Sequence, residues 1–197
     1  MGVTEAIIKM AKENNGTVTT AMVVAAGFSR GNIKYLVDKG MLEKSTRGVY
    51  ILPEVWDDEI FNLQNRFIRG IYSHETALFL WDLTDRTPNR YYMTFPATYN
   101  LTKPKEETIR CVQCKKELYD LGITEVTTPG GNTVRAYSVE RTLCDILRPH
   151  RCVDIQIVTE AFKHYITRSN KNIPVLSEYA TMLKVEAKLR SYLEVLL

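Results

Sequence analysis

"RGNIKYLVDKGMLEKSTRGVYIL", residues 30–52, decides how the first part of the chain folds. Its first half follows Ser29, a residue type that caps helices, and has apolar residues at helical spacing: Ile33, Leu36 and Val37. Gly40 is suited to the left-handed conformation that ends a helix. The second half reads as two short strands joined by the Ser-Thr-Arg-Gly turn at 45–48. A helix followed by a β-hairpin is therefore expected.

Two further short helices are predicted before this stretch. Residues 4–13 show helical spacing of apolar side chains and are followed by Asn-Asn-Gly, and residues 19–27 form a second helix that ends at Gly27. Helices followed by a hairpin, within about fifty residues, are the order of a winged helix-turn-helix, whose last helix enters the major groove of DNA. The sequence predicts a DNA-binding domain of this kind at residues 1–52.

The predicted recognition helix turns polar side chains outward when its apolar side chains pack inward. Arginine and lysine suit guanine edges or phosphates, asparagine pairs with adenine, and a basic hairpin tip reaches a phosphate or the minor groove. Capped helix N-termini also face phosphates. The candidate DNA-binding residues are Thr19, Thr20, Ser29, Arg30, Asn32, Lys34, Tyr35, Lys39, Lys44, Thr46 and Arg47. The alternative, a winged helix that binds protein and has an ordinary solvated basic face, stays open.

The charge distribution favours the DNA-binding interpretation modestly. The chain has 197 residues and a net charge of +3, with a hydrophobic content of 45% that is ordinary for a globular protein. Residues 1–52 contain seven Lys and Arg against four Asp and Glu, while residues 53–197 contain nineteen of each. The whole excess therefore lies in the predicted DNA-binding domain.

The remaining residues predict an α+β domain. Residues 53–72 are expected to form a bridging helix after Pro53, and residues 73–197 a mixed domain in which Ser73 and Ser138 cap helices. Strands are expected around residues 90–101 and 107–114, a hairpin over 123–138, and one long last helix over 175–197. The fold class is therefore α+β, with an N-terminal winged helix-turn-helix domain.

The sequence argues against an enzyme, a metal site and a membrane protein. Cys111 and Cys114 form a C-x-x-C on a predicted strand, where side chains three residues apart face opposite ways, so neither they nor Cys144 and Cys152 are expected to bind metal. A metal-dependent nuclease needs Glu-x-Lys on a strand, and the one instance here, at 186–188, lies in a predicted helix. No cofactor is expected. The lack of a signal peptide or a membrane span predicts a cytoplasmic protein.

Three segments of the chain together resemble the AbiEi family of antitoxins from bacterial type IV toxin–antitoxin pairs. They are the "RGVY" wing, "SHETALFLWDLTDRTP" and "YSVERTLCD", in the family's order. The resemblance implies an N-terminal winged helix that represses its own operon at inverted repeats in promoter DNA. It further implies a C-terminal antitoxin domain, residues 73–197, that counters a nucleotidyltransferase-like toxin without a stable complex, in abortive phage infection. The alternative is a stand-alone winged-helix regulator whose C-terminal domain dimerises or senses a ligand.

Overall fold

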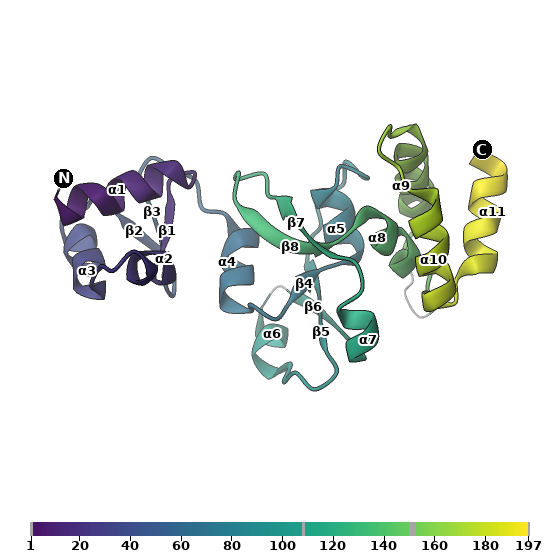
Figure 1. Cartoon of the computed structure of the whole chain (residues 1–197), viewed down its shortest axis with the longest axis horizontal. Helices are drawn as coiled ribbons and strands as arrows, with labels where there is room; N and C mark the ends of the chain where they lie inside the picture. The colour runs from purple at the N-terminus through teal and green to yellow at the C-terminus, as the bar shows by residue number, and fades with distance from the viewer. Residues whose placement is uncertain (1, 108, 150–152, 197) are drawn as a thin grey trace. The chain divides into compact units, whose positions relative to one another are not determined.

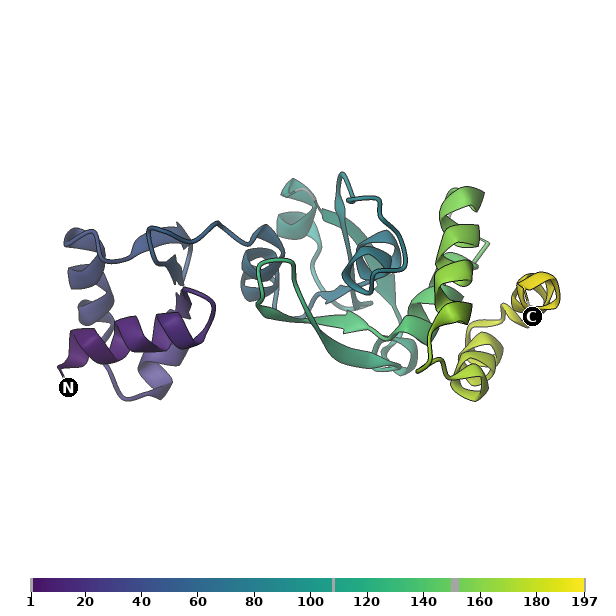
Figure 2. The same cartoon turned by 90° about the horizontal axis from the view of Figure 1, so that it is seen from above.

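The computed structural model describes residues 2–107, 109–149 and 153–196, which form two compact units (Figures 1 and 2). The first unit contains Met1–Arg66 and Thr127–Val134, and the second contains Phe67–Val126 and Arg135–Leu197. Thr127–Val134 belongs to the first unit, and there the side chains of Thr128 and Asn132 donate hydrogen bonds to Asp58. The mixture of helices and strands confirms the predicted α+β class.

The first unit has the element order of a winged helix-turn-helix. Its elements are α1 (Val3–Glu13), β1 (Thr17–Thr19), α2 (Thr20–Ala25), α3 (Arg30–Asp38), β2 (Glu43–Thr46), β3 (Val49–Ile51) and α4 (Glu59–Arg66). The strands form an antiparallel sheet in the order β1-β3-β2. The three helices and the hairpin agree with the pattern of the sequence, whereas β1 was not predicted, because three residues are too few to show alternation. Its pairing with β3 fixes the start of α2 beside the hairpin.

The core of the first unit combines apolar side chains from α1, α2 and α3 with others from the strand β1 and from the segments beside the hairpin. Its buried residues are Ile7, Ala11, Val18, Val23, Ile33, Leu36, Leu42 and Leu52. Burying a large aliphatic side chain stabilises a fold by about 1.5–3 kcal/mol, so this small core accounts for much of the unit's stability. Gly16 closes the core at one end: its φ is +77°, and a Cβ there would lie 2.2 Å from the Val55 side chain. No larger residue fits at that turn.

The bridging helix is shorter than predicted. The sequence pattern predicts a helix over residues 53–72, whereas α4 comprises Glu59–Arg66. Asp58 begins the helix, because its carboxylate accepts a hydrogen bond from the backbone N–H of Phe61 at 3.0 Å. After Gly70 the chain forms β4 (Ile71–Tyr72), which pairs with β5. Strand pairing by two fully buried residues therefore overrides the helical pattern. The domain limits at residues 52 and 72 remain predictions.

The second unit builds a mixed five-stranded sheet and a group of helices after it in the chain. The other elements of this unit are α5 (His74–Leu80), β5 (Tyr91–Pro96), α6 (Thr102–Glu106), β6 (Ile109–Cys114), α7 (Lys116–Tyr119), β7 (Ile123–Thr127), β8 (Thr133–Tyr137), α8 (Val139–Ile146), α9 (Ile155–Thr167), α10 (Ile173–Leu183) and α11 (Glu186–Leu196). The strand order is β6-β5-β4-β8-β7. β4 pairs antiparallel with β5 and parallel with β8, and β5 pairs parallel with β6.

The last helix predicted from the sequence is two helices. The chain breaks between α10 and α11 at Lys184, which has the left-handed φ of +59°. A non-glycine residue in this conformation costs on the order of 1 kcal/mol. The break lets Val185 and Leu189 enter the buried cluster, and it stacks Tyr192 on Phe162 of α9 with ring centroids 4.9 Å apart. The burial of these apolar side chains therefore offsets the cost of the turn. The sequence contains no glycine or proline at this position that would predict the end of a helix.

A buried ion pair holds α8 to the sheet region of the second unit. Arg141 and Asp145 are four residues apart on α8, and their side chains are only 1% and 2% exposed. The Arg141 Nε donates to Asp145 at 3.0 Å, its Nη1 donates to the carbonyls of Leu118 and Leu121, and its guanidinium lies over Tyr137 at 4.2 Å. Burial by itself would lower the pKa of Arg141, but the combined effect of the neighbouring Asp145 and Tyr137 is larger. The pKa of Arg141 is therefore raised above its usual value, and the guanidinium stays cationic.

Asp145→Ala should unfold the second unit at lower urea concentration than the unchanged protein. The substitution leaves the Arg141 cation buried without its carboxylate, which costs about 3–5 kcal/mol of unfolding free energy. Circular dichroism during urea titration measures the loss. Glu13→Ala is the control, because it removes a carboxylate from the exposed pair with Lys9 and should leave the unfolding midpoint unchanged. Equal shifts for the two variants would contradict the role of the buried pair.

Candidate nucleic-acid interface

Helix α3 presents a polar face to solvent because its other face is buried. Ser29 begins the helix by accepting a hydrogen bond from the backbone N–H of Gly31 at 3.2 Å, as predicted. Ile33 and Leu36 are 2% and 0% exposed, which fixes the rotation of the helix about its axis. The helix therefore directs its remaining polar and aromatic side chains away from the core, as the predicted recognition helix requires.

The structure places the predicted DNA-binding residues in three groups. Exposed side chains are those of Ser29, Arg30, Lys34, Tyr35, Lys39, Lys44 and Arg47. Partly buried side chains are those of Thr20, Asn32 and Thr46. Thr19 is buried, and its hydroxyl accepts a hydrogen bond from the Met22 N–H at 3.1 Å, so it caps α2. All of these residues lie on α3, at the ends of α2 and α3, or on the hairpin, and their contact with DNA remains a prediction.

An aromatic ring lies in the middle of the exposed face of α3. The Tyr35 side chain is 51% exposed, and the Lys39 Nζ lies 5.8 Å from the centre of its ring. This distance is that of a cation–π contact, which holds the long lysine side chain over the ring. The pair therefore offers a positive charge and a flat apolar surface side by side, a combination that suits both a phosphate and a thymine methyl group.

The β2–β3 hairpin is irregular at its wing-like tip. Lys44 pairs with Tyr50 and Thr46 with Val49, so the register shifts and Ser45 is an extra residue in β2. Such a bulge bends a strand and redirects side chains. Gly48 closes the turn with φ +81°, and its carbonyl accepts a hydrogen bond from the Thr20 N–H at 2.8 Å. The end of the hairpin is thereby tied to the start of α2.

A cluster of three polar side chains supports the hairpin, and the sequence analysis missed it. The Asn62 Nδ2 donates to the Ser45 Oγ at 2.6 Å and to the Asp57 Oδ1 at 2.7 Å, and the Ser45 hydroxyl donates to the same Asp57 oxygen. Asn62 lies on α4 and is 7% exposed. We call Ser45, Asp57 and Asn62 the wing-support cluster. A contact across 17 residues leaves no local pattern in the sequence.

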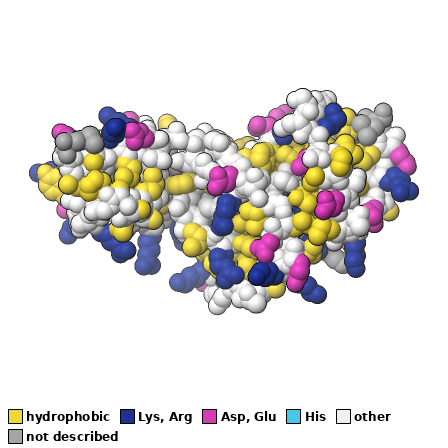
Figure 3. Space-filling model, in the orientation of Figure 1, with side chains coloured by type: hydrophobic (Ala, Val, Ile, Leu, Met, Phe, Trp, Pro, Cys, Tyr) yellow, Lys and Arg dark blue, Asp and Glu magenta, His cyan; other side chains and the backbone are white. Residues whose placement is uncertain are grey.

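Several positive side chains of the first unit lie along one side of it. Figure 3 shows Lys and Arg side chains projecting from the lower edge of this unit, the side on which Figure 1 places α2 and α3, and others at its upper edge. With the sequence's excess of three positive charges in residues 1–52, this side has the electrostatic character that attracts a polyanion.

The "SHETAL" segment of the second unit joins α5 to strand β5. Ser73 precedes α5, but the prediction that its side chain caps the helix was wrong. Its hydroxyl accepts a hydrogen bond from Thr94 at 2.9 Å and lies 3.0 Å from the Nδ1 of His74. The His74 ring stacks on Tyr92 at 5.5 Å, and Thr76 accepts a hydrogen bond from the Tyr92 N–H at 2.8 Å. The segment is thus used for internal packing.

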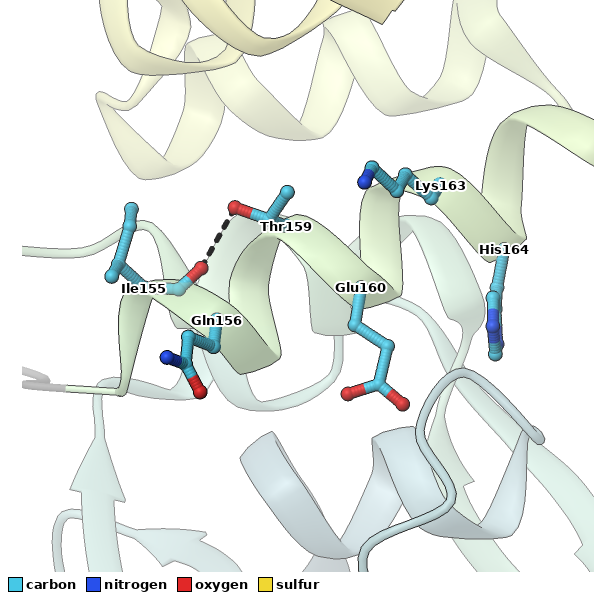
Figure 4. A pocket seen from close by; sticks show the side chains of 6 residues that line it. All are labelled: Ile155, Gln156, Thr159, Glu160, Lys163 and His164. Atoms are coloured by element: carbon cyan, nitrogen blue, oxygen red, sulfur yellow. Dashed lines mark hydrogen bonds between the residues drawn. The ribbon is translucent and has the colours of Figure 1, made fainter.

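The "LTDR" segment after α5 is fastened to helix α9. Thr84 donates to the Glu160 carboxylate at 3.2 Å, and Arg86 donates to the Gln156 side chain at 3.1 Å. Figure 4 shows Gln156, Glu160 and His164 on the same side of α9, beside a hollow of about 410 Å³. Two of the polar side chains at this hollow, Gln156 and Glu160, therefore hold the loop.

The "YSVERTLCD" segment forms the junction between β8 and α8. Ser138 caps α8 as predicted, since its Oγ accepts a hydrogen bond from the Arg141 N–H at 3.3 Å. Glu140 accepts a hydrogen bond from the Tyr165 hydroxyl of α9 at 3.2 Å, and Asp145 pairs with Arg141 inside the unit. Each of the three family-like segments thus contributes side chains or backbone groups to stabilising contacts within its own unit.

The cysteines are neutral thiols where the structure describes them. Burial raises the pKa of Cys111 and Cys114, and it raises the pKa of Cys144 to about 12, so a reactive thiolate is disfavoured. Cys152 lies outside the described residues. Within the described ranges, no three His, Cys, Asp or Glu side chains are grouped to hold a metal ion. Over those same ranges, no helix combines the length and the apolar character needed to span a bilayer.

Comparisons with known proteins identify the first unit more firmly than the second. Residues 5–53 match the family model described as "Transcriptional regulator, AbiEi antitoxin". No curated protein matches the chain. A solved structure, "Crystal structure of RV2827C protein from Mycobacterium tuberculosis", is similar with a TM-score of 0.53 and 14% identity, over 98% of this chain and 80% of that one. That likeness shows the fold alone. The match at residues 5–53, on a domain with the element order of a winged helix, supports the resemblance of this chain to the AbiEi antitoxin transcriptional regulators.

Proposed function

We propose that the protein represses its own operon by binding inverted repeats in promoter DNA, and that its second domain counters a nucleotidyltransferase-like toxin. The observation that carries the first half is the outward face of α3, where Arg30 and Lys34 are exposed beside a hairpin with Arg47 at its tip. The family match to a transcriptional regulator covers these same residues.

The geometry of the first unit suits duplex DNA. An α-helix fits the major groove, and side chains at its N-terminal end then meet base edges. Arg30 lies in the first turn of α3, and Gly31 beside it has no side chain to hold the backbone away from the bases. Arg47 at the hairpin tip would meet the phosphate backbone or the adjacent minor groove. The helix therefore reads the sequence, and the hairpin adds affinity.

The antitoxin half of the proposal rests on the family rather than on a site. The second unit has a substantial core and internally satisfied motif segments. It resembles the domain that, in the AbiEi family, counters the toxin without a stable complex and contributes to abortive phage infection. In that role the protein would act in the cytoplasm, encoded beside its toxin. The identity of the neighbouring gene is the most direct check of this assignment.

Arg30→Ala together with Lys34→Ala should weaken binding to the protein's own promoter by about 30-fold or more, because two good base contacts at about 1–3 kcal/mol each contribute about 2–6 kcal/mol together. Losing two cations should also make the salt dependence of the affinity shallower by about two in log–log slope. Fluorescence anisotropy with a labelled promoter duplex, measured from low to moderate salt, gives both quantities.

The control for that experiment is Lys9→Ala with Lys12→Ala, which removes two cations from α1 instead of α3. It should leave specific binding nearly unchanged. Equal losses in the two double variants would show that net charge, and not the outward face of α3, accounts for binding. The proposed recognition face would then be wrong.

The Arg30→Ala, Lys34→Ala protein should still rescue cells from the toxin, although it should no longer repress the promoter. The two functions are proposed to reside in different domains, so the variant separates them. Growth of cells expressing the neighbouring toxin from an independent promoter measures rescue, and a reporter fused to the operon promoter measures repression. The core variant Asp145→Ala should show the reverse loss, since it destabilises the second unit.

Absence of rescue by the unchanged full-length protein would favour the alternative function. The protein would then be a stand-alone winged-helix regulator whose second domain dimerises or senses a ligand. Repression by the unchanged protein with no rescue is the outcome that distinguishes it, because the DNA-binding half of the proposal does not depend on the toxin.

A further inference from the structure

We infer that the wing-support cluster is a positioning device, through which Asn62 of α4 and Asp57 before it hold the hairpin in the orientation needed for DNA. The inference rests on the proposed function and identifies positioning residues that lie outside the DNA-contacting surface. Ser45, Asp57 and Asn62 would act through Thr46 and Arg47 and would not touch DNA themselves.

The hairpin has few other restraints on its outer strand. β2 lies at the edge of the sheet order β1-β3-β2, so it has a strand neighbour on one side only. The bulge at Ser45 interrupts even that pairing between Lys44 and Thr46. Edge strands with interrupted ladders open more readily than central ones, because fewer backbone hydrogen bonds must break. The side-chain hydrogen bonds of Ser45 therefore restrain β2 at the position where its backbone pairing with β3 is interrupted.

The anchor is attached at the bulged residue and reaches a helix. Asn62 donates to both Ser45 and Asp57, at 2.6 and 2.7 Å, from a side chain that is almost fully buried. The Ser45 hydroxyl also donates to Asp57, so each of the three side chains is held by two hydrogen bonds and the geometry of the cluster is restrained from two directions. On the other side of the turn, the Gly48 carbonyl is bonded to Thr20. The tip with Thr46 and Arg47 is thus held at both ends.

Holding the tip before binding has a consequence for affinity. A mobile hairpin must lose conformational freedom when Arg47 meets the DNA, whereas a hairpin already in place does not. The cluster would therefore strengthen DNA binding without making a contact. It would also extend the DNA-binding device beyond residue 52, into a helix that the sequence analysis assigned only to a bridge.

A double-mutant cycle between Asn62→Ala and Arg47→Ala tests the inference, with promoter affinity measured by fluorescence anisotropy. Asn62→Ala alone should weaken binding by about 3- to 10-fold, on the scale of one lost ordering contribution. In the Arg47→Ala background the same change should weaken binding less than about 2-fold, because the contact that it positions is already gone. The same fold-loss in both backgrounds would overturn the positioning role.

Two hydroxyl variants and one control guard against a trivial loss of folding. Ser45→Ala should reproduce the loss of affinity, while Ser45→Thr keeps the hydroxyl and should restore it. Asn65→Ala is the matched control, because the Asn65 side chain lies on the same helix and bonds only to its own turn, at the Phe61 carbonyl. Its affinity should equal that of the unchanged protein. A loss for Ser45→Thr as large as that for Ser45→Ala contradicts the role of the hydroxyl.

Hydrogen exchange of the free protein separates failure of this inference from failure of the proposed function. In Asn62→Ala, the backbone amides of residues 44–49 should exchange faster, while those of α1 and α3 keep their rates. Unchanged exchange in the hairpin would show that the cluster does not position it. Should the unchanged protein fail to bind its promoter while hairpin exchange still responds, the proposed function fails and the inferred DNA role is overturned with it.

Discussion

The burial of Ile33 and Leu36 is the constraint on which the first unit depends. These two side chains fix the rotation of α3, and everything that the helix offers to a partner follows from that rotation. They also join α3 to the apolar residues of α1 and α2, so the small core and the outward face are two consequences of one packing arrangement. A polar residue at either position would disturb the fold and the exposed face together.

Local sequence signals predicted much of this fold, and their failures share a cause. Ser29, Ser138 and Gly40 act within one helix turn, so their residue types revealed the boundaries of α3 and the start of α8. The short strand β1, the limits of α4 and the break at Lys184 depend on pairing or burial supplied by distant segments. The prediction that Ser73 caps α5 was wrong for the same reason. Its hydroxyl accepts a hydrogen bond from Thr94 of β5, a contact that the local sequence around a helix start does not predict.

The candidate site shows the same division between local and distant determinants. Arg30, Lys34 and Arg47 could be selected from the sequence, because helical period and turn position alone place them outward. Asn62 could not, since an asparagine in a helix is ordinary and its partner Ser45 lies 17 residues earlier. Contacting residues can thus be predicted from periodicity, whereas the residues that position them need coordinates.

The family-like segments of the second unit illustrate how recognition of a family differs from recognition of a site. Thr84 is hydrogen-bonded to Glu160, and Arg141 is enclosed with Asp145, so these side chains stabilise the unit from within. A side chain engaged in this way cannot bind a partner without first breaking its own contact. These segments therefore specify a scaffold. The proposed antitoxin activity would therefore depend on the exposed surface around them, just as the proposed DNA contacts of the first unit lie on the face of α3 that the core leaves exposed.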